Sequence, residues 1–575
     1  MSTAGLAPST AEGGRRRWVG LVVISLAVSL IIVDSTIVNV AIPSIVKDLG
    51  VDSTGVQWVQ ESYTLVFAAL LLVFGTLGDR YGRRLVLIVG VVVFALSSVV
   101  AALAPSGELL IAARFVQGVG GAMVLPSTLS LINAGFAGPE RAIALAVWGS
   151  TIGGMTAVGP LLGGWLTTAY SWRWAFGINI PLGIVIVTGA LLAVAESRDD
   201  ARRRLDPVGA VLSVVASASL VFALIEGRNY GWWAVDHRPR LGSWEWPGGV
   251  SPIPLAFGVA LLAILAWVSW ARARERRGLG SMFAIELLRI RSFRNGNLAA
   301  MIVSLGEFGI ILALPIWLQN VLGFTALDTG LILLALALGS FGASGLAGAF
   351  SGRVRPIVVV RVGLAAEIVG VAGLGDVVRP DAPWAALVPF LFVYGFGVGL
   401  ATAQLTGVIL TDVPVSASGQ ASGTQSTSRQ IGSALGIAVL GTVLFSSASG
   451  LLSNALDQRG IPAAQRDSLV SAVVDSSGAA ISQLAASPAT APAAGDAKEA
   501  FSDGTRYAAW SAAAFLVVGL AATLSLGNAR DEVTPGASGT QSGQDPLPRG
   551  RRRSQPSAEP ALPARSPRGS GMRNG

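Results

Sequence analysis

The sequence predicts an all-α integral membrane protein that crosses the bilayer about fourteen times. The chain of 575 residues is 52% apolar and only 13% charged, and its mean hydropathy is +0.63. A soluble chain of this length carries roughly a quarter charged residues. The apolar residues also occur in long runs, and each helix that crosses a bilayer needs about 20 mostly apolar residues. Composition and patterning therefore agree on a membrane protein.

The first run illustrates the pattern. It extends from Trp18 to Ile32 and continues to Ile45 with a single charge, at Asp34. Runs of this kind recur along the chain, and the predicted spans are 18–43, 56–77, 85–104, 108–133, 141–168, 174–195, 207–226, 252–270, 297–320, 327–350, 356–375, 384–411, 421–446 and 507–527. Three basic residues, Arg15–Arg17, precede the first run as in a signal peptide. That run is too long for a signal peptide and no small-residue cleavage site follows it, so we expect a retained first span.

Basic residues indicate the orientation, because Lys and Arg are enriched in cytoplasmic loops. With the N-terminus inside, the sharpest clusters all fall on the cytoplasmic side: Arg80, Arg83 and Arg84; Arg202–Arg204; and Arg272, Arg274, Arg276, Arg277, Arg289, Arg291 and Arg294. An even number of spans leaves both termini on that side as well. We therefore expect a multi-pass protein of a bacterial cytoplasmic membrane with both termini in the cytoplasm.

Rare residue types exclude several functions. The chain has no Cys and one His, which excludes disulfides, thiolate catalysis, iron–sulfur clusters and Cys/His zinc sites. The two lysines, Lys47 and Lys498, do not follow a glycine, so no Walker A loop for ATP is present. We expect neither an enzyme nor a resident cofactor or metal. The net charge of +8 is spread over loop ends, which argues against nucleic acid as a partner.

The loop after the second predicted span has a specific pattern, Gly75-Thr-Leu-Gly-Asp-Arg-Tyr-Gly-Arg-Arg84. Its glycines allow a tight turn at the membrane edge, and Asp79 can pair with arginines in one conformation and release them in another. The run resembles the signature loop of the major facilitator superfamily. A weaker echo, from Gly345 to Arg355, follows the tenth predicted span, as expected of duplicated transporter halves. The resemblance implies that this loop controls conformational change through Gly75, Asp79, Arg80, Gly82, Arg83 and Arg84.

Further stretches resemble the fourteen-span drug:proton antiporter branch of that superfamily. They are residues 33–43, residues 172–183, residues 419–432, and Gly154 with Gly159-Pro-Leu-Leu-Gly-Gly164. The last run, with Gly154, Gly159, Pro160, Gly163 and Gly164, is similar to the antiporter motif. Helix packing through small residues accounts for glycines in such a run. It does not account for the Gly-Pro step, which should bend or loosen the fifth span.

Charges inside predicted spans cost about 2.5–3.5 kcal/mol each at the bilayer centre, so they are functional candidates. Asp34 lies about 14 Å and Arg114 about 9–10 Å from the outer end of their spans, close enough in depth for a charge pair. The resemblance also matches Arg114 to an arginine implicated in proton transfer. Glu307 and Glu367 lie near the midplane of theirs. We expect these four residues to serve proton coupling or substrate binding, although static packing pairs would look the same. We also expect Arg429 to pair with Asp412.

The predicted organisation follows the resemblance. Residues 1–195 form one six-helix bundle, 196–295 two inserted spans with a linker, and 296–527 a second bundle that includes a long external loop, 447–506. Residues 528–575, rich in Pro, Gly, Ser and Arg, form a disordered cytoplasmic tail.

The expected function is proton-driven export of amphipathic drugs, antibiotics or related small molecules, by a monomer among membrane lipids. Alternatives on the same fold are a proton-linked lipid exporter, a nutrient symporter, and a lipid-binding or sensing protein that transports nothing.

Overall fold

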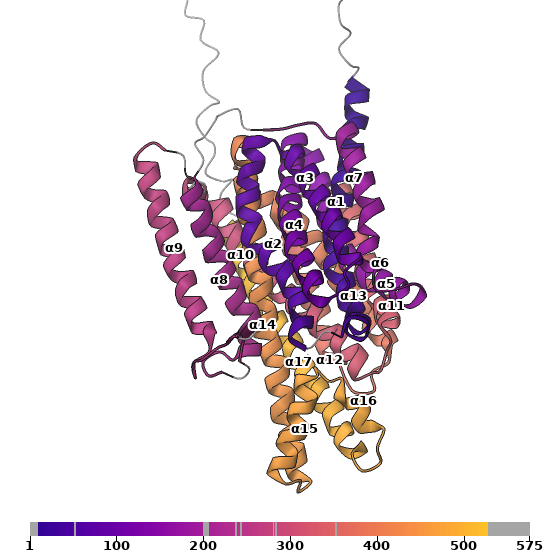
Figure 1. Ribbon diagram of the computed structural model, residues 1–575. Helices are drawn as coiled ribbons and strands as arrows, with labels where there is room; N and C mark the ends of the chain where they lie inside the picture. Colours follow the sequence, from indigo (N-terminus) through magenta and orange to yellow (C-terminus); the bar gives the residue numbers. More distant parts are fainter. Residues whose placement is uncertain are drawn as a thin grey trace, which may run out of the picture. The chain divides into compact units, whose positions relative to one another are not determined.

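The computed structural model describes residues 10–50, 53–198, 206–235, 238–241, 244–279, 281, 285–350 and 354–526 (Figure 1). Nearly all of this part of the chain is helical. The α-helices are α1 (Thr10–Leu49), α2 (Ser53–Tyr81), α3 (Arg83–Ala102), α4 (Gly107–Gly135), α5 (Gly138–Ala169), α6 (Trp174–Gly177), α7 (Asn179–Ala193), α8 (Pro207–Tyr230), α9 (Pro252–Arg276), α10 (Arg291–Asn320), α11 (Ala326–Phe350), α12 (Pro356–Val377), α13 (Trp384–Ile409), α14 (Ser418–Gln458), α15 (Ala463–Asp475), α16 (Ala480–Ala485) and α17 (Ala491–Ala522). Three short 3₁₀ helices span Ile285–Arg289, Val415–Ala417 and Thr523–Leu526, and two-residue strands, β1 (Arg240–Leu241) and β2 (Trp244–Glu245), pair between α8 and α9.

The predicted all-α membrane fold is confirmed. Among the described residues, 12 helices are long and apolar enough to cross a membrane, and α5 makes 13 if its two bent halves are counted as one span. α11 contributes a shorter apolar stretch, Leu327–Ala343. If α11 also crosses, it completes the fourteen, and that total stays a prediction. The tail expected at 528–575 lies outside the described residues.

α5 bends where the sequence places its Gly-Pro step. Its halves, Glu140–Thr156 and Val158–Ala169, meet at 41°. Pro160 has no N–H to donate to the carbonyl of Thr156, four residues earlier, and its ring crowds that carbonyl. The expected bend of the fifth span is therefore present, and it has an identified cause.

The helices before residue 195 pack mainly on one another, and so do those after residue 290. Contacts between these two sets run through α2 against α14 on one side and through α5 against α11 and α13 on the other. Glycines make the first contact close. A Cβ on Gly75 of α2 would collide with the carbonyl oxygen of Gly419 on α14. Small residues allow two backbones to approach in this way without a loss of packing.

The inserted helices α8 and α9 form an antiparallel pair at the edge of the helical body (Figure 1). α8 contacts both α2 and α14, and α9 packs on α8. Asp206 joins the two helices, since its Oδ1 accepts hydrogen bonds from the backbone N–H of Gly209 at the start of α8 and from Trp270 Nε1 of α9, both at 2.9 Å. Leu255, Leu261 and Leu262 of α9 are exposed, as expected of a helix that faces lipid.

The stretch predicted as a long loop, 447–506, contains helices. α14 continues to Gln458, α15 and α16 follow, and α17 begins at Ala491. The abundant Ala explains this, because Ala has the highest helix propensity. Phe501, Ile481 and Val473 give the segment an apolar core. Figure 1 shows α15 and α16 at the end of the body opposite to the start of α1. That this end faces outside stays a prediction.

Candidate transport site

Asp34 of α1 lies at the centre of a closed polar network. Its Oδ1 accepts hydrogen bonds from Gln117 Nε2 of α4 and Asn179 Nδ2 of α7, both at 2.7 Å. Its Oδ2 lies 2.6 Å from Arg114 Nη1 of α4. Ser98 Oγ of α3 accepts from both amides, at 2.9 Å and 3.2 Å. Four helices therefore meet at one carboxylate whose exposed fraction is 0%.

Arg114 has as many partners as Asp34. Its Nε donates to the carbonyl of Val59 on α2 at 3.0 Å, and its Nη1 also donates to Gln117 Oε1 at 2.7 Å. The Tyr63 ring lies 4.3 Å from the guanidinium carbon, which adds a cation–π contact. The charge pair expected from matched depth is thus present. Each charge is compensated by the other and by neutral dipoles, the condition under which a buried pair is tolerated.

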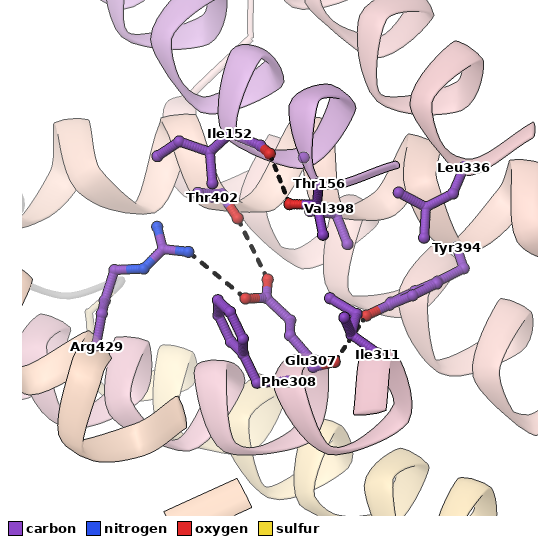
Figure 2. A pocket seen from close by; sticks show the side chains of 11 residues that line it. Ile152, Thr156, Glu307, Phe308, Ile311, Leu336, Tyr394, Val398, Thr402 and Arg429 are labelled. Atoms are coloured by element: carbon purple, nitrogen blue, oxygen red, sulfur yellow. Dashed lines mark hydrogen bonds and ion pairs between the residues drawn. The ribbon is translucent and has the colours of Figure 1, made fainter. Parts of the chain in front are cut away.

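Glu307 of α10 lies beside a cavity between the two sets of helices (Figure 2). The cavity leaves about 20 Å³ of room for water, and the volume rises to about 370 Å³ only when the open space at its mouth is included. Glu307 Oε2 is 3.5 Å from Arg429 Nη2 of α14, and Thr402 Oγ1 of α13 donates to Oε1 at 3.3 Å. The rest of the lining is mainly apolar and comes from α5, α10, α11 and α13: Ile152, Gly153, Thr156, Phe308, Ile311, Leu336, Tyr394 and Val398.

The pairing of Arg429 corrects the sequence prediction. Arg429 contacts Glu307, whereas Asp412 Oδ2 accepts a hydrogen bond from Ser292 Oγ at 2.7 Å. The predicted pair was wrong because Asp412 ends up near the start of α10, beyond the end of α13. Arg429 lies three turns into α14, at the depth of the middle of α10.

Glu367 of α12 is buried at 0% exposure, and neither carboxylate oxygen has a hydrogen-bond partner among the described residues. α13 covers it closely, since a Cβ on Gly397 would lie 2.7 Å from Glu367 Cγ. An ionised carboxyl in such surroundings pays a large desolvation cost, and protonation removes the charge. Glu367 is not among the residues that line the cavity of Glu307, although the two carboxyl groups lie close enough to interact electrostatically.

The signature loop links α2, α3 and α14. Asp79 Oδ1 pairs with Arg83 Nη2 at 2.7 Å and accepts the backbone N–H of Gly419 at 2.7 Å, and Oδ2 accepts that of Gln420 at 3.0 Å. The carboxylate therefore satisfies free N–H groups at the start of α14. Arg83 Nη2 donates to the carbonyl of Val415 at 2.7 Å. We call this end of the helices, where α2 finishes and α3 begins, the Asp79 end.

The remaining residues of the signature loop make contacts of their own. Gly82 has a φ of 117°, which favours glycine, and a Cβ there would lie 2.7 Å from the Glu196 carboxyl carbon. Glu196 accepts the backbone N–H groups of Arg84 at 3.0 Å and Leu85 at 3.2 Å, at the start of α3. Arg84 Nη1 donates to the carbonyl of Val194 at 3.1 Å. Arg80 is exposed, with its guanidinium 5.6 Å from the Tyr81 ring.

The glycines of the antiporter-like run lie at helix contacts of α5. A Cβ on Gly163 would lie 2.9 Å from Ile37 Cγ1 of α1, and Gly159 faces Thr36 of the same helix. Gly154 faces the Phe341 ring of α11, and Gly164 lies near Leu327. The small residues therefore let α5 contact α1 and α11 at once. Gly153, next to Gly154, also lines the cavity.

Sequence reasoning missed four uncharged or peripheral partners. Gln117 and Asn179 complete the Asp34 network, Thr402 binds Glu307, and Glu196 holds the signature loop. Gln117 lies three residues after Arg114, on the same helical face, and this spacing could have revealed it. Asn179 lies inside the run 172–183 that had been noted only as a resemblance. The other two carry no local signal, because their partners are distant in the chain.

The fold and the site together define a class of protein. Many apolar helices carry buried charges, and one charged pair lines a hollow between two sets of helices, as in membrane transporters. No group of three or more His, Cys, Asp or Glu side chains suited to a metal ion occurs in the described part of the chain.

The chain belongs to the Major Facilitator Superfamily, whose sequence pattern matches residues 24–437. It is similar to multidrug resistance protein Stp of Mycobacterium tuberculosis, with 34% identity over 80% of this chain and 82% of that protein. It is also 34% identical to the puromycin resistance protein of Streptomyces alboniger, over 79% of this chain and 86% of that one. The solved structure of the proton:xylose symporter XylE has the same fold, with a TM-score of 0.55, 12% identity, and coverage of 88% of this chain and 95% of that one. The predictions of this superfamily, and of a transporter rather than an enzyme, are confirmed.

Proposed function

We propose that this protein exports amphipathic drugs, antibiotics or related small molecules in exchange for protons. The observation that carries the proposal is the cavity of Glu307, an ionisable side chain in an otherwise mainly apolar hollow between two sets of helices. A ligand there can place an apolar body against Ile152, Phe308 and Leu336 and a polar tip against Glu307. The names of the relatives from Mycobacterium tuberculosis and Streptomyces alboniger support drugs as substrates.

Proton coupling follows from the cost of moving buried acids. While the cavity is closed to both sides of the membrane, burying a protonated carboxyl group costs less free energy than burying a charged carboxylate. At Glu307, a polar tip of the substrate and a proton compete for the same oxygens. At Asp34, protonation weakens the attraction of Arg114, and this change alters the contacts between α1 and α4. Export and proton entry are then two halves of one cycle, and neither ATP nor a cofactor is required.

Three further parts complete the proposal. The two sets of helices, residues 1–195 and 296–527, act as bundles that rock around the cavity. The Asp79 end faces the cytoplasm of a bacterial cell, which agrees with the basic residues Arg80, Arg83 and Arg84. The protein acts as a monomer, since all the groups invoked belong to one chain.

The test is drug accumulation in bacteria that express the protein. Puromycin and a panel of cationic and neutral dyes are measured inside cells with and without a protonophore. We expect lower accumulation of at least one compound than in cells that carry the empty vector, and a protonophore should abolish the difference. Equal accumulation in both strains for the whole panel would refute drug export. Protonophore-insensitive efflux would refute proton coupling.

A further inference from the structure

α14 carries a column of polar side chains that leads from the Asp79 end to the cavity. Its members, Ser418, Ser422, Gln425 and Arg429, follow one another at intervals of four, three and four residues. This spacing places them on one face of the helix, over about 16 Å at 1.5 Å per residue. Ser418, Ser422 and Gln425 are buried, with exposed fractions of 0%, 0% and 1%. A buried polar face within a membrane helix needs partners along its whole length.

Each end of the column has such partners. At the Asp79 end, Ser418 Oγ accepts a hydrogen bond from Asn133 Nδ2 of α4 at 2.6 Å. Near the cavity, Gln425 Nε2 donates to Thr406 Oγ1 of α13 at 2.7 Å. Thr406 Oγ1 in turn donates to the carbonyl of Thr402 at 2.9 Å. The side-chain hydroxyl of Thr402 donates to Glu307, so Thr406 and Thr402 lie between Gln425 and the carboxyl group in the cavity.

Some oxygen atoms in and beside the column lack partners. Three buried oxygens have no hydrogen bond in the described part of the chain: Asn133 Oδ1, Ser422 Oγ and Gln425 Oε1. Ser422 and Gln425 are one turn apart, a spacing that a single water molecule can bridge. Buried polar atoms are almost always satisfied, and ordered water is the usual partner where protein groups are lacking. Three acceptors in sequence along one path therefore point to bound water rather than to three separate defects.

We propose that this column holds a file of water molecules that carries protons between the Asp79 end and Glu307. The proposal rests on the proposed proton coupling and adds the route by which protons leave the cavity. A proton from the Glu307 carboxyl group passes to the nearest water, each water gives one proton to the next, and the last is released at the Asp79 end. The side chains of Thr406, Gln425 and Ser422 hold the waters in line.

The state of the Asp79 end would then control the route. Asp79, Arg83, Asn133 and the first residues of α14 close this end in the structure, through the contacts to Gly419, Gln420, Val415 and Ser418. Opening of the end would connect the column to the aqueous side. Protons would be released when the cavity faces that side and would be retained when it does not.

The first test measures hydration and needs no substrate. The chain has no native cysteine, so Ser422→Cys and, one residue earlier, the control Ala421→Cys can be compared directly. Ala421 is equally buried but lies in an apolar cluster. In purified full-length protein, 2-aminoethyl methanethiosulfonate should modify Ser422→Cys about tenfold faster, because thiols in apolar surroundings are inert. Equal rates would overturn the proposal.

The second test separates proton movement from substrate movement. Gln425→Leu removes a member of the column, and Thr406→Val removes the hydroxyl group that accepts the hydrogen bond of Gln425. The control Thr424→Val removes a hydroxyl that bonds only the backbone of its own helix, at Gln420. In proteoliposomes, puromycin transport driven by a pH gradient should fall about a hundredfold in the first two variants, the lower end of the contribution of a positioned proton-transfer group. Exchange of puromycin for puromycin at equal pH should stay within about twofold, since it needs no net proton transfer.

The outcomes distinguish this proposal from the function on which it rests. Equal losses of gradient-driven transport and exchange would show a structural role for the column, and no loss in either would show no role. Both results overturn the proposal. Absence of gradient-driven puromycin transport by the unmodified protein would instead contradict the proposed function for this drug. The thiol-modification result would then decide on its own whether the column is hydrated.

Discussion

Two of the buried acid–arginine pairs in the described part of the chain differ in how completely they are enclosed. Asp34 and Arg114 have side-chain exposures of 0% and 1%, and their shortest contact is 2.6 Å. Glu307 and Arg429 have exposures of 3% and 16%, with a contact of 3.5 Å, and both line the cavity. Two amides, a serine and an aromatic ring surround the first pair. The second pair has one threonine and an open hollow.

This difference in enclosure indicates that the two pairs have different roles. A pair whose hydrogen bonds are all made is held in one geometry, and any change in its charge affects several helices at once. In a loose pair that faces a cavity, the acid can exchange its arginine partner for a ligand at a small cost in free energy. We therefore propose that the Asp34 pair couples the helices to one another and that the Glu307 pair contacts the substrate. The following predictions test this assignment.

The two pairs should differ most in their contribution to the free energy of unfolding. Arg114→Ala leaves Asp34 charged in a fully buried site and should cost about 3–5 kcal/mol. Arg429→Ala leaves Glu307 beside a cavity that water can enter, and we expect a loss of about 1–2 kcal/mol. Thermal unfolding of the two purified variants in the same detergent measures this difference. A greater loss in Arg429→Ala would reverse the comparison.

Transport should depend most strongly on Asp34. Asp34→Asn keeps the size and an acceptor for Gln117 and Asn179 but cannot take up a proton. We expect substrate uptake into inverted vesicles, driven by a pH gradient, to be abolished while the protein remains folded. The parallel measurement is proton release on addition of substrate. Normal uptake together with normal proton release would exclude Asp34 as the coupling site and leave Glu307 or Glu367.

The two glutamates should separate in a binding assay. Glu307→Gln keeps the hydrogen bond to Thr402 but removes the charge at the cavity, and we expect substrate affinity to fall about tenfold, a loss of one charge-assisted hydrogen bond. Glu367→Gln should leave affinity unchanged, because Glu367 does not line the cavity. Equilibrium binding to purified protein provides the readout. Equal effects in both variants would mean that the cavity extends to Glu367 in the binding state.

The Asp79 end should affect rate rather than affinity. Asp79→Asn removes the charge that pairs with Arg83 and holds the first N–H groups of α14, far along the helix from the cavity. We expect slower turnover, by about tenfold for a change of about 1.4 kcal/mol in one conformational barrier. Substrate affinity should remain almost unchanged. A large affinity loss with normal turnover would contradict this role.

The smallest effect should occur at the solvent-exposed pair of Asp48 and Arg173. Hydrogen bonds from Arg173 and Trp172 lower the pKa of Asp48 below its ordinary value of 3.8. Because the folded value is the lower one, the pair stabilises the protein above pH 3.8 and loses that contribution as the pH falls through the folded value. Asp48→Asn should leave transport at pH 7 unchanged and lower stability only slightly, since exposed pairs contribute little. The difference in unfolding temperature from the unmodified protein should vanish at strongly acidic pH. A defect in transport would give this pair a role that its exposure does not predict.

Sequence reasoning reached part of the site. The depth of Asp34 and Arg114 along their helices predicted a contact, because position along a membrane helix converts directly into depth. The same reasoning failed for Arg429, which was assigned to Asp412 although α14 carries it to Glu307. Depth ranks residues along the membrane normal, and it does not say which helices are neighbours. Glu307 and Glu367 illustrate this limit. The two residues lie at similar depth, yet only Glu307 lines the cavity.

The sequence by itself determined the class of structure and the position of its charges. Long apolar runs require helices in a bilayer, the Gly-Pro step at Pro160 requires a bend, and the motif residues identify the family, since each effect is local in the chain. The tertiary structure alone decided which pair is sealed and which is open. Asn179 and Thr402 lie 145 and 95 residues from the carboxylates that they bind, and the helices at 463–485 form on an apolar core that spans several segments. Such contacts arise from packing between helices, and no pattern within a single helix records them.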